Sequence, residues 1–435
     1  MMERKNILII YALKEYPTRN MTSDLLYSFK RHSNHRIFYY NRFINKLPEY
    51  LRNATFDAII FHQSVTFTCD SRQWKIRQED FKHFLEGKNC IKVALFQDEY
   101  VYTDLSVRFL NECEIDYAYT VAPQSEWNKI YRGLNKKTKI MPMLTGYIER
   151  KPEKYYESKL EKNRTIDVGY RAVWDKDSIV LGRFGYDKIR IADAFRKALK
   201  DTGVKESVRV GSKYIIKGKR WNDFLSSCRY ILGVESGASA LDNDGSIYNA
   251  VKRAIENDPD ISVEQLYNDY VQGKDETFKL RAISPRHFEA IEEGACQILY
   301  EGEYSGVLRP GVHYIPLKKD HSNLIDIINQ LDDEERRKKI VKTAYEEIVK
   351  SGRYTYDNFV RCFFNDIFAK YSNVTAGKHD FFDTFRLNIL INIHEIKIKC
   401  YVIGIQTLKK CRVMTIIRKN KLIKKLMEDY HGQRI

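Results

Sequence analysis

Short apolar runs alternate regularly with helix-like segments along this chain, and this alternation limits the folds that it can adopt. Over the first 145 residues the apolar runs are short, and between them apolar residues recur at helical spacing. This pattern is typical of parallel strands that are buried on both faces and connected by helices. The predicted strands cover 7–12, 36–40, 58–62, 92–97 and 117–121, and the predicted helices cover 22–31, 78–86, 103–112 and 125–132.

A second alternation follows the polar segment 146–164. Two such series predict two Rossmann-like, doubly wound α/β lobes, residues 1–145 and 165–352, which face a central cleft at the carboxyl ends of their strands. The aromatic helix expected at 353–372 would close the second lobe, and 373–435 forms a basic helical tail. Within the second lobe the predicted strands cover 166–170, 208–210, 230–234 and 296–300, and the predicted helices cover 186–202, 221–227, 246–272, 285–293 and 324–351.

Composition limits the class of partner and the compartment. The 435 residues carry a formal net charge of +16, which suits an anionic partner such as a nucleotide diphosphate, a nucleic acid or an acidic lipid. No aromatic RNA-binding motif accompanies the charge, so a nucleic acid partner is not expected. The eight cysteines show no zinc-ligand spacing and are interpreted as reduced thiols of a cytoplasmic protein. The first apolar run is interpreted as a strand rather than a signal peptide, and no segment approaches a membrane span.

The segment 284–294 is the best-defined helix of the sequence. Ser284 suits the N-cap, Pro285 the first helical position, and Gly294 the left-handed stop. Free amides at such a start, together with Arg286, favour an anion. Glu289 lies one turn further on, where a carboxylate can accept hydrogen bonds from a vicinal diol such as that of ribose. An ordinary capped surface helix has the same spacing.

Two neighbouring segments resemble a known family. Residues 284–300 (Ser-Pro-Arg-His-Phe-Glu-Ala-Ile-Glu-Glu-Gly-Ala-Cys-Gln-Ile-Leu-Tyr) and 306–317 look like the C-terminal half of group-1 glycosyltransferases, in the branch that includes the CgeB-like spore-maturation proteins. Segments 166–171, 181–183 and 228–239 support this. The resemblance covers about 165–371, whereas 1–145 agrees in pattern alone and 373–435 does not agree.

The resemblance implies the GT-B fold and the transfer of a sugar from a nucleotide-diphosphate donor. It implies no cofactor and no metal, because basic side chains and helix amides neutralise the leaving diphosphate. In this family the acceptor would be a saccharide or lipid-linked glycan, as in surface polysaccharide synthesis. Carried over residue by residue, Glu289 would bind the donor ribose, and Arg171 and Lys188 would face the diphosphate. Arg183 is a further candidate on that side, with a solvent-exposed residue as the alternative, and His287 adds positive charge at the start of the 284–294 helix.

One departure from the family concerns an acidic residue. The family often places a second glutamate eight positions before the ribose glutamate, and here that position is Arg281. Glu235 follows a similar strand, and an added stretch at 241–280 separates it from Glu289, so Glu235 is the candidate for the donor-sugar acid. A polar residue that caps the following turn is the alternative. The run Asp242-Asn-Asp-Gly-Ser is interpreted as a turn rather than a calcium loop, since it lacks the later glutamate.

Candidates for acceptor chemistry follow two predicted strands of the first lobe. An inverting transferase needs a general base beside the acceptor hydroxyl. His62 and Asp98 lie at strand ends that would face the cleft and are the two candidates for this base. In the second lobe, Glu301 and Ser305 follow the strand at 296–300 and are expected to contact the donor.

The tail supplies a further prediction. Residues 378–435 contain 13 Lys and Arg against 5 Asp and Glu, and 416–427 has the pattern of a basic amphipathic helix. Such a helix can lie on an anionic membrane at its cytoplasmic face, and a solvated or oligomer-packing helix is the alternative. Two other functions also remain open at this point: a nucleotide-sugar epimerase of similar two-lobed build, and a non-catalytic nucleotide- or anion-binding protein.

Overall fold

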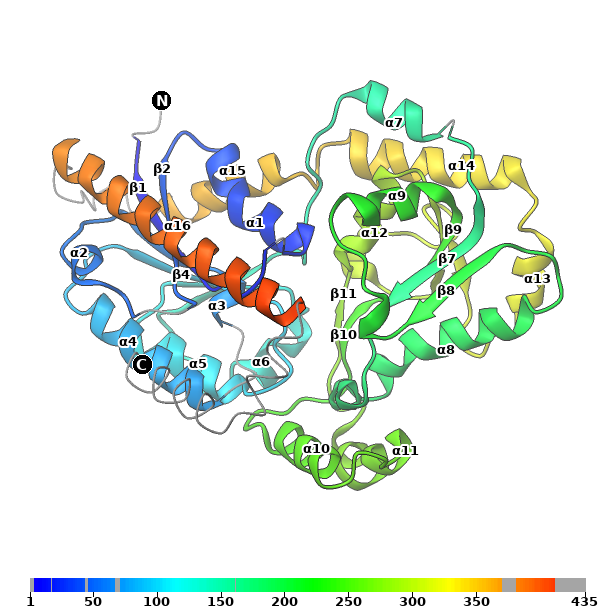
Figure 1. Ribbon diagram of the computed structural model, residues 1–435, viewed down its shortest axis with the longest axis horizontal. Helices are drawn as coiled ribbons and strands as arrows, with labels where there is room; N and C mark the ends of the chain where they lie inside the picture. Colours follow the sequence, from blue (N-terminus) through cyan, green and yellow to red (C-terminus); the bar gives the residue numbers. More distant parts are fainter. Residues whose placement is uncertain are drawn as a thin grey trace.

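The computed structural model describes residues 4–16, 18–43, 46–66, 71–160, 162–369 and 381–410. They form two α/β lobes side by side, and each lobe has a parallel sheet covered by helices (Figure 1). The predicted fold class is therefore confirmed.

The first lobe contains a six-stranded parallel sheet in the order β2-β1-β3-β4-β5-β6. All five predicted strands are present. The sixth, β6, was not predicted, because its four side chains are exposed or half-buried and give no apolar run. The elements are β1 (Asn6–Tyr11), α1 (Asn20–Arg31), β2 (Arg36–Asn41), α2 (Glu49–Arg52), β3 (Ala58–Phe61), α3 (Gln63–Thr66), α4 (Ser71–Leu85), β4 (Ile91–Leu95), α5 (Thr103–Glu112), β5 (Tyr117–Thr120), α6 (Trp127–Ile130) and β6 (Lys139–Pro142).

The second lobe contains a five-stranded parallel sheet in the order β13-β12-β9-β7-β8. The helix expected at 324–351 is divided, because a turn at 330–333 separates two shorter helices. The elements are α7 (Glu153–Leu160), β7 (Ile166–Ala172), α8 (Arg183–Ala198), β8 (Glu206–Val210), α9 (Lys219–Ser227), β9 (Cys228–Gly233), α12 (Pro285–Glu292), β12 (Cys296–Tyr300), β13 (Ile315–Leu317), α13 (Leu324–Asn329) and α14 (Glu334–Ala344).

The aromatic helix α15 (Tyr356–Phe368) packs on the first lobe, not on the second as the sequence suggested. Its buried phenylalanines belong to the same core as the first sheet. The ring of Phe363 lies edge-on to that of Phe29 in α1, with centroids 5.1 Å apart. The chain thus returns to the lobe where it began, because the aromatic face of α15 packs against the apolar face of α1.

The added stretch between β9 and α12 forms a small helical unit attached to the second lobe. It holds an antiparallel pair, β10 (Ser236–Ala238) and β11 (Leu280–Ala282), with α10 (Ser246–Asn257) and α11 (Val263–Leu266) between them. This unit also contacts the first lobe. The amide of Tyr102 donates to the carbonyl of Asp242 at 2.7 Å, and the Tyr102 hydroxyl donates to Asn249 Oδ1 at 2.9 Å. The insertion therefore joins the two lobes, and its helices α10 and α11 lie at the bottom of the view in Figure 1.

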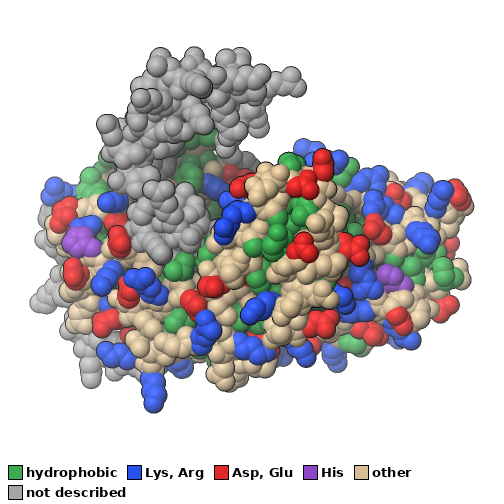
Figure 2. All heavy atoms as spheres, turned by 90° about the horizontal axis from the view of Figure 1, so that it is seen from below, with side chains coloured by type: hydrophobic (Ala, Val, Ile, Leu, Met, Phe, Trp, Pro, Cys, Tyr) green, Lys and Arg blue, Asp and Glu red, His purple; other side chains and the backbone are tan. Residues whose placement is uncertain are grey.

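The last described helix, α16 (Phe381–Lys410), crosses the first lobe and contacts β2. Among the described helices, none has the length and apolar character needed to cross a bilayer. The amphipathic helix expected at 416–427 lies outside the described residues. Seen from below, basic side chains are interspersed with acidic ones (Figure 2), so the positive excess does not form one patch on this face.

Candidate functional site

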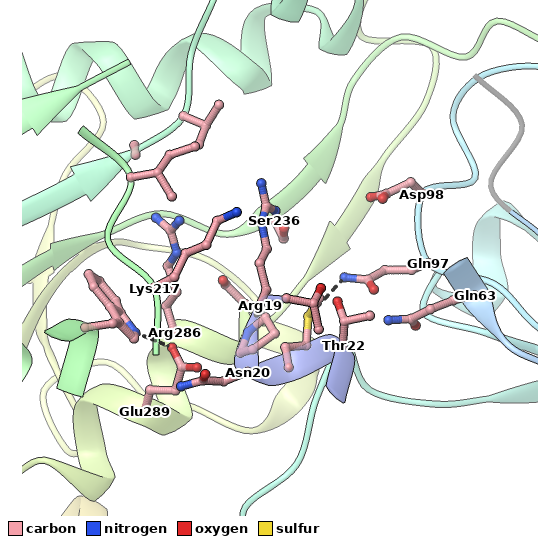
Figure 3. A pocket seen from close by; sticks show the side chains of 18 of the residues that line it. Arg19, Asn20, Thr22, Gln63, Gln97, Asp98, Lys217, Ser236, Arg286 and Glu289 are labelled. Atoms are coloured by element: carbon pink, nitrogen blue, oxygen red, sulfur yellow. Dashed lines mark hydrogen bonds between the residues drawn. The ribbon is translucent and has the colours of Figure 1, made fainter. Parts of the chain in front are cut away.

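A cavity of about 740 Å³ lies between the carboxyl ends of the two sheets. In the first lobe β1 has β2 on one side and β3 on the other, and in the second lobe β7 lies between β8 and β9. Helical connections leave such points in opposite directions and open a crevice there. The loops after β1 and β4 and the helix α3 after β3 supply one wall, and the loops after β7, β8 and β9 together with the start of α12 supply the other (Figure 3). The cavity is therefore where a doubly wound fold places a ligand.

The start of α12 faces this cavity, as predicted. Ser284 occupies the N-cap in extended conformation, although its side chain makes no capping hydrogen bond, and Pro285 follows at the first helical position. Glu289 lies one turn further on in the cavity wall. Its Oε2 accepts a hydrogen bond of 2.7 Å from the indole Nε1 of Trp221 in α9. Burial raises the pKa of Glu289, while this hydrogen bond opposes the shift.

Basic residues of both lobes line the cavity: Lys14, Arg19, Arg77, Arg171, Lys188, Lys217 and Arg286. Burial and the nearby charge of Arg286 lower the pKa of Lys188 to about 8. Arg286 donates a hydrogen bond to the carbonyl oxygen of Arg171. This bond holds the guanidinium of Arg286 at the N-terminus of α12. Lys217 binds both carboxylate oxygens of Glu15 at 2.9 Å, so this ion pair joins the two lobes at the cavity. The site therefore concentrates positive charge where an anionic group can bind.

Arg171 lines the cavity, but its guanidinium is bound to the neighbouring strand. Its guanidinium donates to the Ser207 hydroxyl at 3.0 Å, to the Ser207 carbonyl and to the Tyr170 carbonyl, and it stacks on the ring of Phe224. The side chain thus ties β7 to β8 instead of reaching toward an anion. Its location directly after an apolar strand segment suggested a ligand, but the neighbouring strand offers it acceptors first.

Glu235 lies in the cavity wall and is buried. Its Oε1 accepts hydrogen bonds from the amides of Tyr304 (2.8 Å) and Glu303 (3.0 Å). Burial raises the pKa of Glu235, while the Tyr304 amide and the charge of Arg281 oppose the shift. The carboxylate thus caps the turn after β12, and not the turn that directly follows Glu235 in the sequence. Its role as the donor-sugar acid stays a prediction.

Asp98 follows β4 and lines the same cavity as Lys188 (Figure 3 shows Asp98). The side chain of Asp98 reaches solvent at the cavity. Desolvation by the surrounding cavity wall raises the pKa of its carboxyl, and the positive charges of Lys188 and Arg19 oppose this shift. The next residue, Glu99, is buried. It accepts hydrogen bonds from Thr120 Oγ1 at 2.6 Å and from the Tyr131 hydroxyl, and burial raises its pKa to about 7. A carboxylate at the position of Asp98 can accept a proton from a bound hydroxyl.

His62 does not face the cavity. The side chain is fully buried, and burial lowers its pKa to about 3, so the ring is neutral. Its Nδ1 accepts the amide of Ser64 at 3.1 Å. Among the described residues no partner meets Nε2. The expectation of a base at this strand end is wrong in geometry, because the ring turns back into the sheet core while the following residue, Gln63, lines the cavity.

Of the four remaining residues that were predicted to bind the donor, one lines the cavity and three do not. His287 lines the cavity but is buried, and burial lowers its pKa to about 4. Its Nδ1 lies 2.8 Å from Gln297 Oε1 and its Nε2 lies 3.2 Å from the Val234 carbonyl oxygen. Three others are not among the described residues that line the cavity: Arg183, Glu301 and Ser305. The Arg183 guanidinium lies over the Tyr267 ring, and the Ser305 hydroxyl accepts the amide of Ile283. Glu301 is exposed beyond the end of β12.

Several cavity residues were missed by the sequence analysis, among them Arg19, Gln63, Gln97, Lys217 and Trp221. Gln97 ends the predicted strand 92–97 directly before Asp98, so the sequence carried a signal for it, whereas Arg19 lies at the start of α1. Lys217 and Trp221 lie around the start of α9, and nothing local distinguishes them from surface residues. Within the described ranges, no group of three His, Cys, Asp or Glu side chains is arranged to hold a metal ion.

No protein-family signature and no curated protein sequence matches the chain. Solved structures do share its architecture. An α-glucosyltransferase in complex with UDP-glucose and DNA containing an abasic site superposes with a TM-score of 0.50 at 10% identity, over 85% of this chain and 100% of that chain. HepE from Anabaena, in complex with UDP and glucose, gives 0.47 at 10% identity, over 84% of this chain and 100% of that chain. The likeness to the α-glucosyltransferase shows that the two lobes form the GT-B fold, as the resemblance implied, and at such identity it establishes the fold alone.

Proposed function

We propose that the chain transfers a sugar from a nucleotide-diphosphate donor to a saccharide or lipid-linked glycan acceptor. The observation that carries this proposal is the cavity between the lobes, where basic side chains of both lobes surround the start of α12 and Glu289 stands one turn beyond it. A diphosphate needs the cations, and a ribose diol needs an acceptor such as the Glu289 carboxylate. These two requirements meet in one place.

The residues suit a transfer in which the diphosphate leaves. Charge on the departing phosphate is stabilised by groups fixed in advance, here Arg286, Lys188 and Arg19. In this scheme the basic side chains, rather than a metal ion, neutralise the leaving group, so a chelator leaves the rate unchanged. Asp98 stands across the cavity and would take the proton of an acceptor hydroxyl if the transfer inverts the anomeric centre. Glu235 would contact the donor sugar through Oε2.

Donor binding is the first experiment. Thermal unfolding is measured with a panel of nucleotide sugars, because a ligand that binds the folded state raises the midpoint by mass action. UDP sugars head the panel, since the similar structures were solved with UDP or UDP-glucose. A shift with one donor, lost in Glu289→Ala, supports the proposal. No shift with any nucleotide sugar at millimolar concentration would contradict it.

Transfer is distinguished from epimerisation by the acceptor. With the donor that binds, release of free nucleoside diphosphate should depend on an added glycan. Interconversion of the sugar nucleotide without any acceptor would instead identify an epimerase. We also propose that the chain belongs with the CgeB-like branch of group-1 enzymes and serves surface polysaccharide synthesis, on the sequence segments around α12.

A further inference from the structure

The helix α16 is apolar on two opposite faces. One face packs on the first lobe through the buried side chains of Leu387, Ile391, Ile398 and Val402. Polar contacts fix the same face: the ring of His394 stacks on Tyr40, with centroids 4.3 Å apart, and Glu395 Oε2 accepts the Tyr11 hydroxyl at 2.5 Å. The orientation of the helix is therefore set by the protein core.

The opposite face carries a row of isoleucines. Ile389, Ile393 and Ile396 are 43%, 46% and 62% exposed, and they are spaced four and three residues apart, so they lie on one side of the helix. The core face of α16 is already buried, so this exposed row of isoleucines is not needed for packing within the lobe. Such a row marks a surface that binds a second partner. This row lies on the first lobe, away from the cavity.

Basic side chains border the row. Arg386 lies seven residues before Ile393 and thus in the same row, and the exposed Lys397 follows Ile396. Lys399 lies on the other border and bonds to Glu395 at 3.4 Å. From 384 to 405 Glu395 is the sole acidic residue, and its carboxylate faces Tyr11 and Tyr16. Beyond the helix, residues 411–435 contain seven Lys and Arg against two Asp and Glu.

We propose that the outward face of α16 docks on an anionic membrane surface, with its axis along the surface. Isoleucines would enter the boundary between headgroups and acyl chains, while Arg386 and Lys397 reach the lipid phosphates. A second copy fits less well. In a dimer that pairs two such rows, Lys397 would lie near Lys397 of the second copy, and Arg386 would be buried. An anionic surface instead supplies negative charge to both side chains. This surface lies outside the cavity, so the inference does not depend on the proposed transfer reaction.

The test is sedimentation of the full-length protein with vesicles. Phosphatidylcholine vesicles are compared with vesicles that contain phosphatidylglycerol, at low and physiological salt. We expect binding to the anionic vesicles, weakened by salt. The triple variant I389S/I393S/I396S should lower the partition coefficient at least tenfold, although residues 411–435 are intact. The matched control is I325S with Y270S, which removes exposed apolar side chains of the second lobe (59% and 37% exposed) and should change nothing.

Two further measurements keep the outcome decisive. Thermal unfolding shows whether the triple variant is folded; if it is not, hydrogen exchange of the natural chain replaces it, and vesicles should slow exchange across 389–396. Equal vesicle binding by the natural chain and a folded triple variant would overturn the proposal. So would a molar mass in solution that falls from dimer to monomer in that variant, because a second copy would then cover the row.

Discussion

The indole of Trp221 in α9 donates a 2.7 Å hydrogen bond to the carboxylate of Glu289 in α12. One helix of the second lobe thus orients the residue that another helix presents to the cavity. Among the described residues no donor bonds to Oε1 of Glu289, so this oxygen is available for a ligand hydroxyl. The pair makes the ribose prediction testable through two residues instead of one.

Glu289→Ala should weaken donor binding by roughly 10- to 100-fold, since hydrogen bonds to a charged group contribute about 1.5–3 kcal/mol. Trp221→Phe should weaken it less, because the carboxylate remains and only its orientation is lost. Titration calorimetry with the donor from the panel measures both. Unchanged affinity in Glu289→Ala would remove this residue from the donor site.

Arg286→Ala and Arg171→Ala should have different effects on the transfer rate and on unfolding stability. Arg286 lines the cavity at the start of α12, so its loss should raise the transfer barrier by about 2–4 kcal/mol, seen in kcat. Arg171 bonds to β8, so its loss should lower unfolding stability by about 1–2 kcal/mol and leave kcat nearly unchanged. Steady-state kinetics and denaturant unfolding of both variants decide. The reverse pattern would restore Arg171 as the diphosphate ligand.

Donor affinity should fall as pH rises above about 8. The pKa of Lys188 is lowered to about 8 by burial and by Arg286, so the free protein loses this positive charge there. A diphosphate binds the charged form, and binding above that pH must also take up a proton, which weakens affinity by up to about tenfold per pH unit. Lys188→Arg should keep the affinity level to pH 9.5. If the donor affinity of the natural protein does not decline above pH 8, Lys188 does not contact the phosphate.

Unfolding stability should fall between pH 4.5 and 7 because of Glu99. Burial raises the pKa of this carboxyl from 4.5 to about 7, so in this window the folded state holds a proton that the unfolded state has lost. The folded form binds more protons, and the free energy of unfolding therefore decreases as pH rises, by about 3 kcal/mol in all. Glu99→Gln should remove that portion of the slope. Glu292, whose pKa is also raised to about 7, contributes equally in both proteins and cancels from the comparison.

Gly245→Ala should loosen the contact between the insertion and the first lobe. Gly245 has a φ of +81°, and a Cβ there would lie 1.8 Å from the ring of Tyr102. Tyr102 would have to move, so we expect destabilisation of about 2–4 kcal/mol. Gly273→Ala in the same insertion is the control, because a Cβ there meets nothing within 4 Å. Equal melting temperatures for the two variants would show that the Tyr102 contact contributes nothing.

Local patterns determined much of this protein. The apolar runs before Gln97 and before Glu301 needed no partner to be recognised, because a strand buried on both faces has the same composition whatever its neighbour is. The placement of α12 was equally local, since Ser284, Pro285 and Gly294 mark its ends. Two lobes with a cleft between them followed from these patterns, whereas the place of Glu289 in the cleft came from the family resemblance, because an ordinary capped surface helix has the same spacing.

Tertiary structure decided which polar residues at those strand ends reach the cavity. His62 and Gln63 are adjacent, yet the histidine turns into the core and the glutamine into the cleft, because the chain enters α3 between them. Arg171 is bound by β8, and α15 returns to the first lobe, through partners far away in sequence. Periodicity specifies which face of an element is apolar, but a side chain's direction beyond the strand end depends on acceptors and packing surfaces that only the assembled lobes supply.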